Sequence, residues 1–179
     1  GKPLSAWMRE LPMELEDATN SVAAAAIRQI GVKGLPYILR ELRQKDTKPK
    51  ELLGKCNDWL EEKLRLKLFN FRLTLERRCV AFIAIAALGT NAAPAIPEIV
   101  RNLDDPEIVL NNCYALAVIG LPALPELRRL AQPTNAKTRE NCASAFAVFP
   151  ENEEAESVLL SLTRDKSQRV RQIAVFSLS

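Results

Sequence analysis

Residues 112–120 read NCYALAVIG, and similar runs of nine residues recur along the chain. The others are AAAAIRQIG at 23–31, AFIAIAALG at 81–89, CASAFAVFP at 142–150 and RQIAVFSLS at 171–179. We call the last residues of the five runs the anchors; they are Gly31, Gly89, Gly120, Pro150 and Ser179. Successive anchors are 58, 31, 30 and 29 residues apart, and 58 is twice 29. A period near 30 residues indicates a repeat architecture.

The residues before each anchor follow one pattern. Five places before it stands Ala26, Ala84, Ala115, Ala145 or Ala174. Four places before it stands Ile27, Ile85, Leu116, Phe146 or Val175, and one place before it stands Ile30, Leu88, Ile119, Phe149 or Leu178. These three positions share one face of an α-helix. We therefore predict a helix in each run, with close helix packing at the alanine and a left-handed C-terminus at each glycine anchor.

A second amphipathic stretch follows each of the first four anchors. The four stretches are 35–42, 93–103, 124–130 and 154–162. Pro36, Pro94 and Pro125 stand five places after their anchors, where proline favours the start of a helix. The unit is thus helix, turn, helix, and one unit buries its apolar face only against its neighbours. The sequence predicts an all-α, single-domain α-solenoid over 1–179, with about 4.5 units.

One unit resembles a known repeat family. The stretch DDPEIVLNNCYALAVIG at 104–120, followed by LPALPELRRL, resembles a HEAT repeat of the short type seen in phycobilisome lyases. The opening of 165–179 is similar, with Asp165 before the helix and Val170-Arg171 inside it. This resemblance implies an armadillo-like superhelix whose second helices line a concave surface. No other unit has arginine at the Arg171 offset, so we expect no regular ladder of Asp–Arg contacts.

Two segments depart from the repeat. Residues 46–75 form an irregular insertion, with an amphipathic helix over 50–63 and a strand-like alternation over 65–75. The insertion covers the side of the solenoid, binds a partner, or is a degenerate repeat. Residues 1–12 predict a capping helix that carries Leu4, Trp7, Met8 and Leu11.

The last predicted helix ends at Ser179 without a partner helix. We expect its far face either to be capped by Arg169 and Gln172 or to dock on another chain.

The composition excludes catalytic and zinc sites that depend on histidine. The chain has no histidine, six glycines and a formal net charge of +3. Cys56, Cys79, Cys113 and Cys142 contain no CxxC pair, so we interpret them as buried thiols, with a disulfide as the alternative. We expect no metal and no cofactor; a zinc site in particular lacks both a CxxC pair and a histidine. We expect no enzymatic activity, because the carboxylate pairs lie on adjacent helix residues that point apart. The chain has no apolar run of 18 or more residues, so we expect no membrane-spanning segment.

The candidate binding residues are basic. The predicted second helices carry Arg40, Arg43, Arg101, Arg128 and Arg129, whose forked guanidinium groups suit carboxylate or phosphate. A secondary group in the insertion interleaves aromatic and basic residues, as nucleic-acid-binding surfaces do. This group is Trp59, Lys63, Arg65 and Lys67. The alternative for the five arginines is that they only solvate the surface. The alternative for the secondary group is a solvated charged face over core aromatics.

These residues favour a non-enzymatic scaffold that displays a concave helical groove to a protein or peptide. The alternative is a nucleic-acid-binding HEAT-like module, and a HEAT-like DNA glycosylase is a weaker one, because no acid gathers with aromatics in these residues. The chain begins Gly1-Lys2 rather than with Met, which leaves the compartment open between cytoplasmic and, after removal of a leader or anchor, extracytoplasmic.

Overall fold

The chain is built from helices. The computed structural model describes residues 1–45, 63, 65, 74–103, 108–132, 135–149 and 152–178. Every regular element within these ranges is an α-helix or a 3-10 helix, and none of them is a strand. The predicted all-α class is therefore confirmed.

The repeated apolar runs form the long helices. These first helices are α3 (Val22–Ile30), α6 (Thr74–Leu88), α8 (Val109–Ile119), α10 (Ala136–Phe146) and α12 (Gln168–Ser177). The first three end one residue before their glycine anchors, as predicted. The anchors Pro150 and Ser179 lie outside the described residues.

The glycine anchors reverse the chain at the helix ends. Gly31, Gly89 and Gly120 have positive φ angles of 61°, 54° and 89°. The predicted left-handed helical conformation is wrong at Gly31 and Gly120, because their ψ angles are −146° and −149°. These angles lie in a region that only glycine populates readily. The anchors thus turn the chain directly into the next helix.

The second helices follow after short 3-10 turns. They are α4 (Leu35–Leu42), α7 (Ile96–Arg101), α9 (Leu124–Leu130) and α11 (Glu153–Leu162). The turns before the first three are η1 (Gly31–Gly34), η2 (Gly89–Ala95) and η3 (Leu121–Ala123). The predicted bounds of α4 and α9 are confirmed. The prediction for the second unit was too long, because Pro94 lies inside η2 and Pro97 opens α7.

Two short helices lie at the N-terminus. Within the predicted cap over 1–12, the helix is α1 (Leu4–Arg9), and α2 (Leu15–Thr19) follows it. Both helices contact α3 and α6. Met8 and Leu11 are buried, and Leu4 and Trp7 pack partly buried against the core. This segment therefore covers apolar side chains of the first unit.

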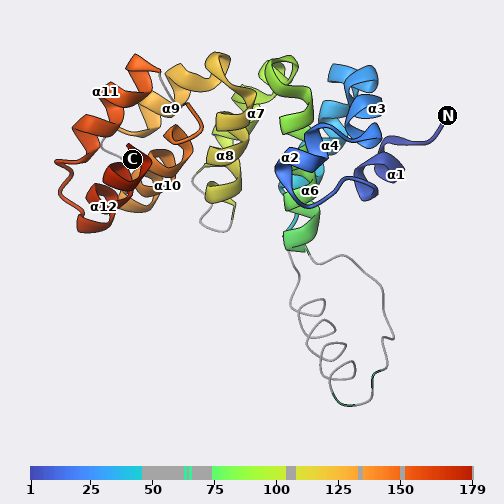
Figure 1. The fold of residues 1–179 in the computed structure, drawn as a ribbon, viewed down its shortest axis with the longest axis horizontal. Coiled ribbons are helices and arrows are strands. Elements are labelled where there is room, and N and C mark those ends of the chain that lie inside the picture. The colour runs from blue at the N-terminus through green and yellow to red at the C-terminus, as the bar shows by residue number, and fades with distance from the viewer. Residues whose placement is uncertain are drawn as a thin grey trace.

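Consecutive units pack side by side. Contacts join α3 to α6, α6 to α8, α8 to α10 and α10 to α12. Each second helix also contacts the first helix of the next unit. Figure 1 shows the chain advancing along the long axis from the N-terminal helices to α11 and α12. The alanines at the predicted close-packing position are fully buried in four units, namely Ala84, Ala115, Ala145 and Ala174.

The predicted insertion over 46–75 lies almost wholly outside the described residues. Its C-terminal boundary is wrong, because α6 already begins at Thr74, and Thr74 and Leu75 are helical rather than extended. The Thr74 side chain is 1% exposed, so the first turn of α6 belongs to the packed fold.

One stretch, Glu76–Arg101, is long and apolar enough by composition to cross a membrane, although no apolar run of 18 residues exists. In the structure it comprises most of α6 with η2 and α7, and half of its most apolar window is buried within the fold. Since a core helix has the same composition, this stretch is weak evidence for membrane insertion.

Candidate functional site

The five candidate arginines lie on the second helices, toward their C-terminal ends. Arg40 is in α4 and Arg43 is its C-cap residue, Arg101 ends α7, and Arg128 and Arg129 are in the last turn of α9. All five are exposed to solvent. A basic residue at a helix C-terminus is favourable by itself, because it meets the negative end of the helix dipole. Their position alone therefore does not require a ligand.

Two of these arginines bridge consecutive second helices. Arg43 Nη2 lies 2.7 Å from Glu98 Oε1 and joins the end of α4 to α7. Arg128 Nη1 lies 3.0 Å from Glu154 Oε1 and joins α9 to α11. Both pairs are well exposed, so each contributes at most about 1 kcal/mol. A competing carboxylate from a partner could replace Glu98 or Glu154 at small cost.

The other three arginines differ in their surroundings. Arg129 pairs with Glu126 at 2.8 Å within α9. Arg40 lies over the ring of Tyr37, 4.7 Å from its centroid, in a cation–π contact. Its Nε is 4.0 Å from Glu41, whose carboxylate already accepts two hydrogen bonds from Arg77.

Arg101 has no ion pair with another described residue. In contrast, Arg43, Arg128 and Arg129 each lie beside a carboxylate on the surface of the second helices. Arginines and carboxylates lie next to one another on it, so it is no continuous positive groove. To bind phosphate, Arg43, Arg128 and Arg129 would each first have to break an ion pair with a carboxylate. A mixed surface of this kind favours a protein ligand with both charge signs over a nucleic-acid backbone.

The secondary candidates are placed only in part. Lys63 and Arg65 are exposed, whereas Trp59 and Lys67 lie outside the described residues. The predicted interleaving of aromatic and basic side chains therefore stays a prediction.

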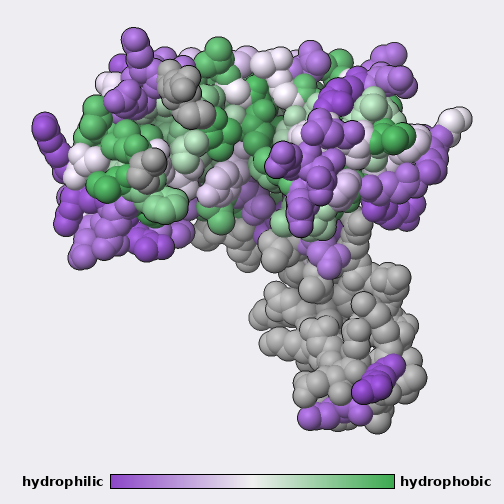
Figure 2. All heavy atoms as spheres, in the orientation of Figure 1, coloured by the Kyte–Doolittle hydropathy of each residue, from purple (hydrophilic) through white to green (hydrophobic). Residues whose placement is uncertain are grey.

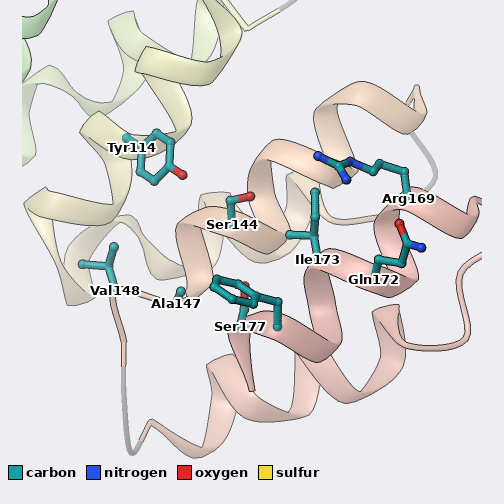
Figure 3. A pocket seen from close by; sticks show the side chains of 9 residues that line it. Tyr114, Ser144, Ala147, Val148, Arg169, Gln172, Ile173 and Ser177 are labelled. Atoms are coloured by element: carbon teal, nitrogen blue, oxygen red, sulfur yellow. The ribbon is translucent and has the colours of Figure 1, made fainter. Parts of the chain in front are cut away.

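A hollow of about 620 Å³ lies near the C-terminal end of the molecule. It is open to solvent, and α8, α10 and α12 line it, as Figure 3 shows. The apolar part of its wall comes from Tyr114, Val148, Ile173 and Phe176, and the polar rim includes Arg169 and Gln172. In Figure 2, apolar side chains gather over the end of the molecule that carries α10 and α12. Arg169 and Gln172, which were expected to cap the far face of the last helix, line this hollow. The hollow itself was not predicted, because its wall joins three helices.

A smaller hollow of about 330 Å³ lies beside a buried ion pair. Arg139 of α10 donates to both oxygens of Asp165, from Nε at 2.7 Å and from Nη2 at 2.9 Å. This pairing lowers the pKa of the Asp165 carboxyl and keeps it ionised. Arg171 instead donates to the backbone carbonyls of Asp165 and Lys166. Because the Arg139 fork is already occupied by Asp165, the pair serves the packing of α10 against the α11–α12 turn.

The described residues contain no group of three cysteine or acidic side chains placed to hold a metal ion. Cys113 and Cys142, from neighbouring first helices, are fully buried with their Sγ atoms 3.9 Å apart. Both are free thiols. The contact with Cys113 and burial strongly raise the pKa of Cys142, so this thiol stays protonated and is a poor nucleophile.

Comparisons with protein-family models, curated proteins and solved structures gave no match to this chain.

Proposed function

We propose that the chain is a non-enzymatic scaffold that binds a protein or peptide. In this proposal the helix pairs are HEAT-like repeats of an α-solenoid, about 4.5 in number, and the second helices form its ligand-binding surface. The contact of each first helix with the next supports the solenoid arrangement. The resemblance of 104–130 to a HEAT repeat supports it further.

One observation carries the binding role. Exposed arginines of α4 and α9 pair with carboxylates of α7, α9 and α11 that are at least partly exposed, and two of these ion pairs bridge successive units. A ligand with complementary charges would exchange these weak internal pairs for its own. Shape and charge pattern then select the partner, and no chemical step is needed.

The test compares two variants of the full chain in affinity capture from cell lysate, with and without nuclease. The first changes Arg40, Arg43, Arg101, Arg128 and Arg129 to Ala. The control changes five exposed basic residues off the second helices to Ala, namely Lys2, Arg9, Lys137, Arg164 and Lys166. We expect a protein ligand that survives nuclease, binds the control and is lost from the first variant.

Two outcomes contradict the proposal. Captured material that nuclease releases, and that binds with a steep dependence on salt, would indicate the nucleic-acid-binding module instead. A protein ligand that binds both variants equally would place the binding surface away from the arginines.

A further inference from the structure

We propose that Cys113 and Cys142 are a disulfide site that links α8 covalently to α10. The link forms while the chain folds in the presence of a small-molecule disulfide, of which oxidised glutathione is an example. Such links form and persist in oxidising environments. The disulfide would form whether or not the chain binds a ligand, so it is independent of the proposed scaffold role.

The two sulfur atoms are already neighbours in the core. Cys113 Sγ and Cys142 Sγ lie 3.9 Å apart, and both side chains are fully buried. A disulfide joins its sulfur atoms at about 2.05 Å, so each atom has to move by only about 1 Å. Both thiols are free in this structure. The arrangement is thus that of a reduced pair close to bonding distance.

The packing of the two helices explains why such short side chains meet. The first helices α8 and α10 lie side by side and contact one another directly (Figure 1). Ala115 and Ala145, at the close-packing position of each helix, are fully buried, and their small side chains let the two backbones approach. Each cysteine lies within one helical turn of the alanine in its own helix. The same packing that joins the two units therefore holds the sulfur atoms together.

The repeat register shows that this pair of positions is special to one helix contact. Cys113 stands seven places before its anchor, and Cys142 stands eight places before its own. The contacts of α6 with α8 and of α10 with α12 hold other residues at these two positions, namely Phe82 with Asn112 and Ala143 with Arg171. A covalent link at these positions is therefore available only between α8 and α10.

Thiol–disulfide exchange with oxidised glutathione gives a balanced reaction. The thiolate of one cysteine attacks a glutathione sulfur, which forms a mixed disulfide and releases one reduced glutathione. The thiolate of the other cysteine then attacks the protein sulfur of the mixed disulfide and releases the second. Two cysteine thiols are oxidised, one glutathione disulfide is reduced, and the two cysteine protons pass to the two glutathione thiols. The second step is favoured because it is intramolecular.

Burial determines when this exchange takes place. The reacting species is the thiolate, and contact with Cys113 together with burial strongly raises the pKa of Cys142 in the folded chain. The thiol is then protonated and out of reach of glutathione. The exchange therefore precedes closure of the core during folding. Once formed, the buried link is protected from reductants.

The link would hold α9 within a closed loop. The two cysteines are 29 residues apart, and α9 lies between them with Arg128 and Arg129. A disulfide restricts the unfolded chain and so stabilises the folded one. We expect the linked chain to unfold at a temperature about 5 °C or more above that of the reduced chain.

The test refolds the full chain from guanidinium at mildly alkaline pH, once in a mixture of oxidised and reduced glutathione and once in excess reductant. Free thiols are then alkylated with iodoacetamide under denaturing conditions and counted by intact mass. The chain has four cysteines, so we expect two alkylated thiols after the first refolding and four after the second. Peptide mapping without reduction should find Cys113 linked to Cys142.

Two variants separate this pair from the other cysteines. The double variant Cys56→Ala with Cys79→Ala retains only the proposed pair and should have no free thiol after refolding with the glutathione mixture. Thermal unfolding of its linked and reduced forms measures the stabilisation without interference. In the matched variant Cys142→Ala, the three remaining thiols should all stay free.

Three results would overturn the proposal. The first is four free thiols in the wild-type chain after refolding with the glutathione mixture. The second is a disulfide that joins any other pair of cysteines. The third is a link between Cys113 and Cys142 that lowers the unfolding temperature, which would show that the bonded pair does not fit between α8 and α10.

Discussion

At the scale of single residues, the Arg139–Asp165 pair is a buried contact of two hydrogen bonds across units. Both side chains are buried, at 3% and 9% exposed, and the two partners are 26 residues apart. Asp165 also accepts a hydrogen bond from the Ser167 backbone N–H at 2.7 Å. A buried ion pair need not stabilise a fold more than apolar residues would, but removal of one partner leaves the other charge uncompensated.

We therefore expect Asp165→Asn to lower the free energy of unfolding by about 3–5 kcal/mol at neutral pH. The control is Glu154→Gln, which breaks the exposed pair with Arg128 and should cost at most about 1 kcal/mol. Urea unfolding of both variants at pH 7 measures the difference. Equal effects of the two substitutions would show that burial does not strengthen the Arg139 pair.

The same carboxylate gives a pH dependence. The pKa of Asp165 is lower in the folded chain, chiefly because Arg139 donates hydrogen bonds to it. Its contribution to stability is therefore present above the unfolded pKa of about 3.9 and is lost as pH falls through the lower folded value. Asp165→Asn should lose less stability than the wild-type chain in urea titrations taken from pH 5 to pH 2. Parallel losses in both proteins would contradict this assignment.

At the scale of elements, the turn glycines end the first helices and start the next element. A Cβ added at Gly31 would meet no atom within 4 Å, and one at Gly120 would meet only Thr90 Cγ2, at 3.9 Å. Space therefore does not require glycine at either position. The positive φ angles require it, because an L side chain is strained there.

Gly31→Ala and Gly120→Ala should each destabilise the chain by about 1–3 kcal/mol through backbone strain alone. Leu121→Ala, next to Gly120 and 64% exposed, is the control and should change stability by less than about 0.5 kcal/mol. Thermal and urea unfolding report the difference. A neutral Gly31→Ala variant would mean that the turn relaxes to negative φ.

At the scale of the whole molecule, the helices that pack against one another belong to the same unit or to adjacent units. An array with this contact pattern opens from its ends, because an end unit has one neighbour and a central unit has two. In native-state hydrogen exchange we expect α12 to exchange fastest among the first helices and α8 slowest. Asp165→Asn should speed exchange in α10 and α12 and leave α3 unchanged. One common rate for all first helices would contradict this.

Predictions from the sequence agree best with the structure where interactions between near neighbours along the chain determine the conformation. The bounds of α4 and α9 and the positive φ at Gly31, Gly89 and Gly120 were predictable, since apolar period and glycine conformation act within a few residues. The errors at Pro94 and Thr74 are also local in kind. At Pro94, a 3-10 turn and the start of an α-helix carry similar sequence signals. At Thr74, the alternation of apolar residues predicted a strand where α6 begins.

The candidate site was less predictable. The five arginines were expected on second helices and lie there, but their partners Glu98 and Glu154 come from other units. A local sequence pattern does not predict which distant carboxylate will pair with an arginine side chain. The hollow beside α12 was missed for the same reason, since its walls come from three helices.

By itself, the sequence determined the helical class, the unit length and the apolar face of each first helix. These follow from periodicity and from backbone preference, which depend on near neighbours along the chain. Only the tertiary structure decided that Arg139 meets Asp165, that Arg43 meets Glu98, and that Val175 is exposed where Leu116 is buried. Burial and pairing depend on which elements pack together, and identical positions in a repeat differ when one has a neighbour and another does not.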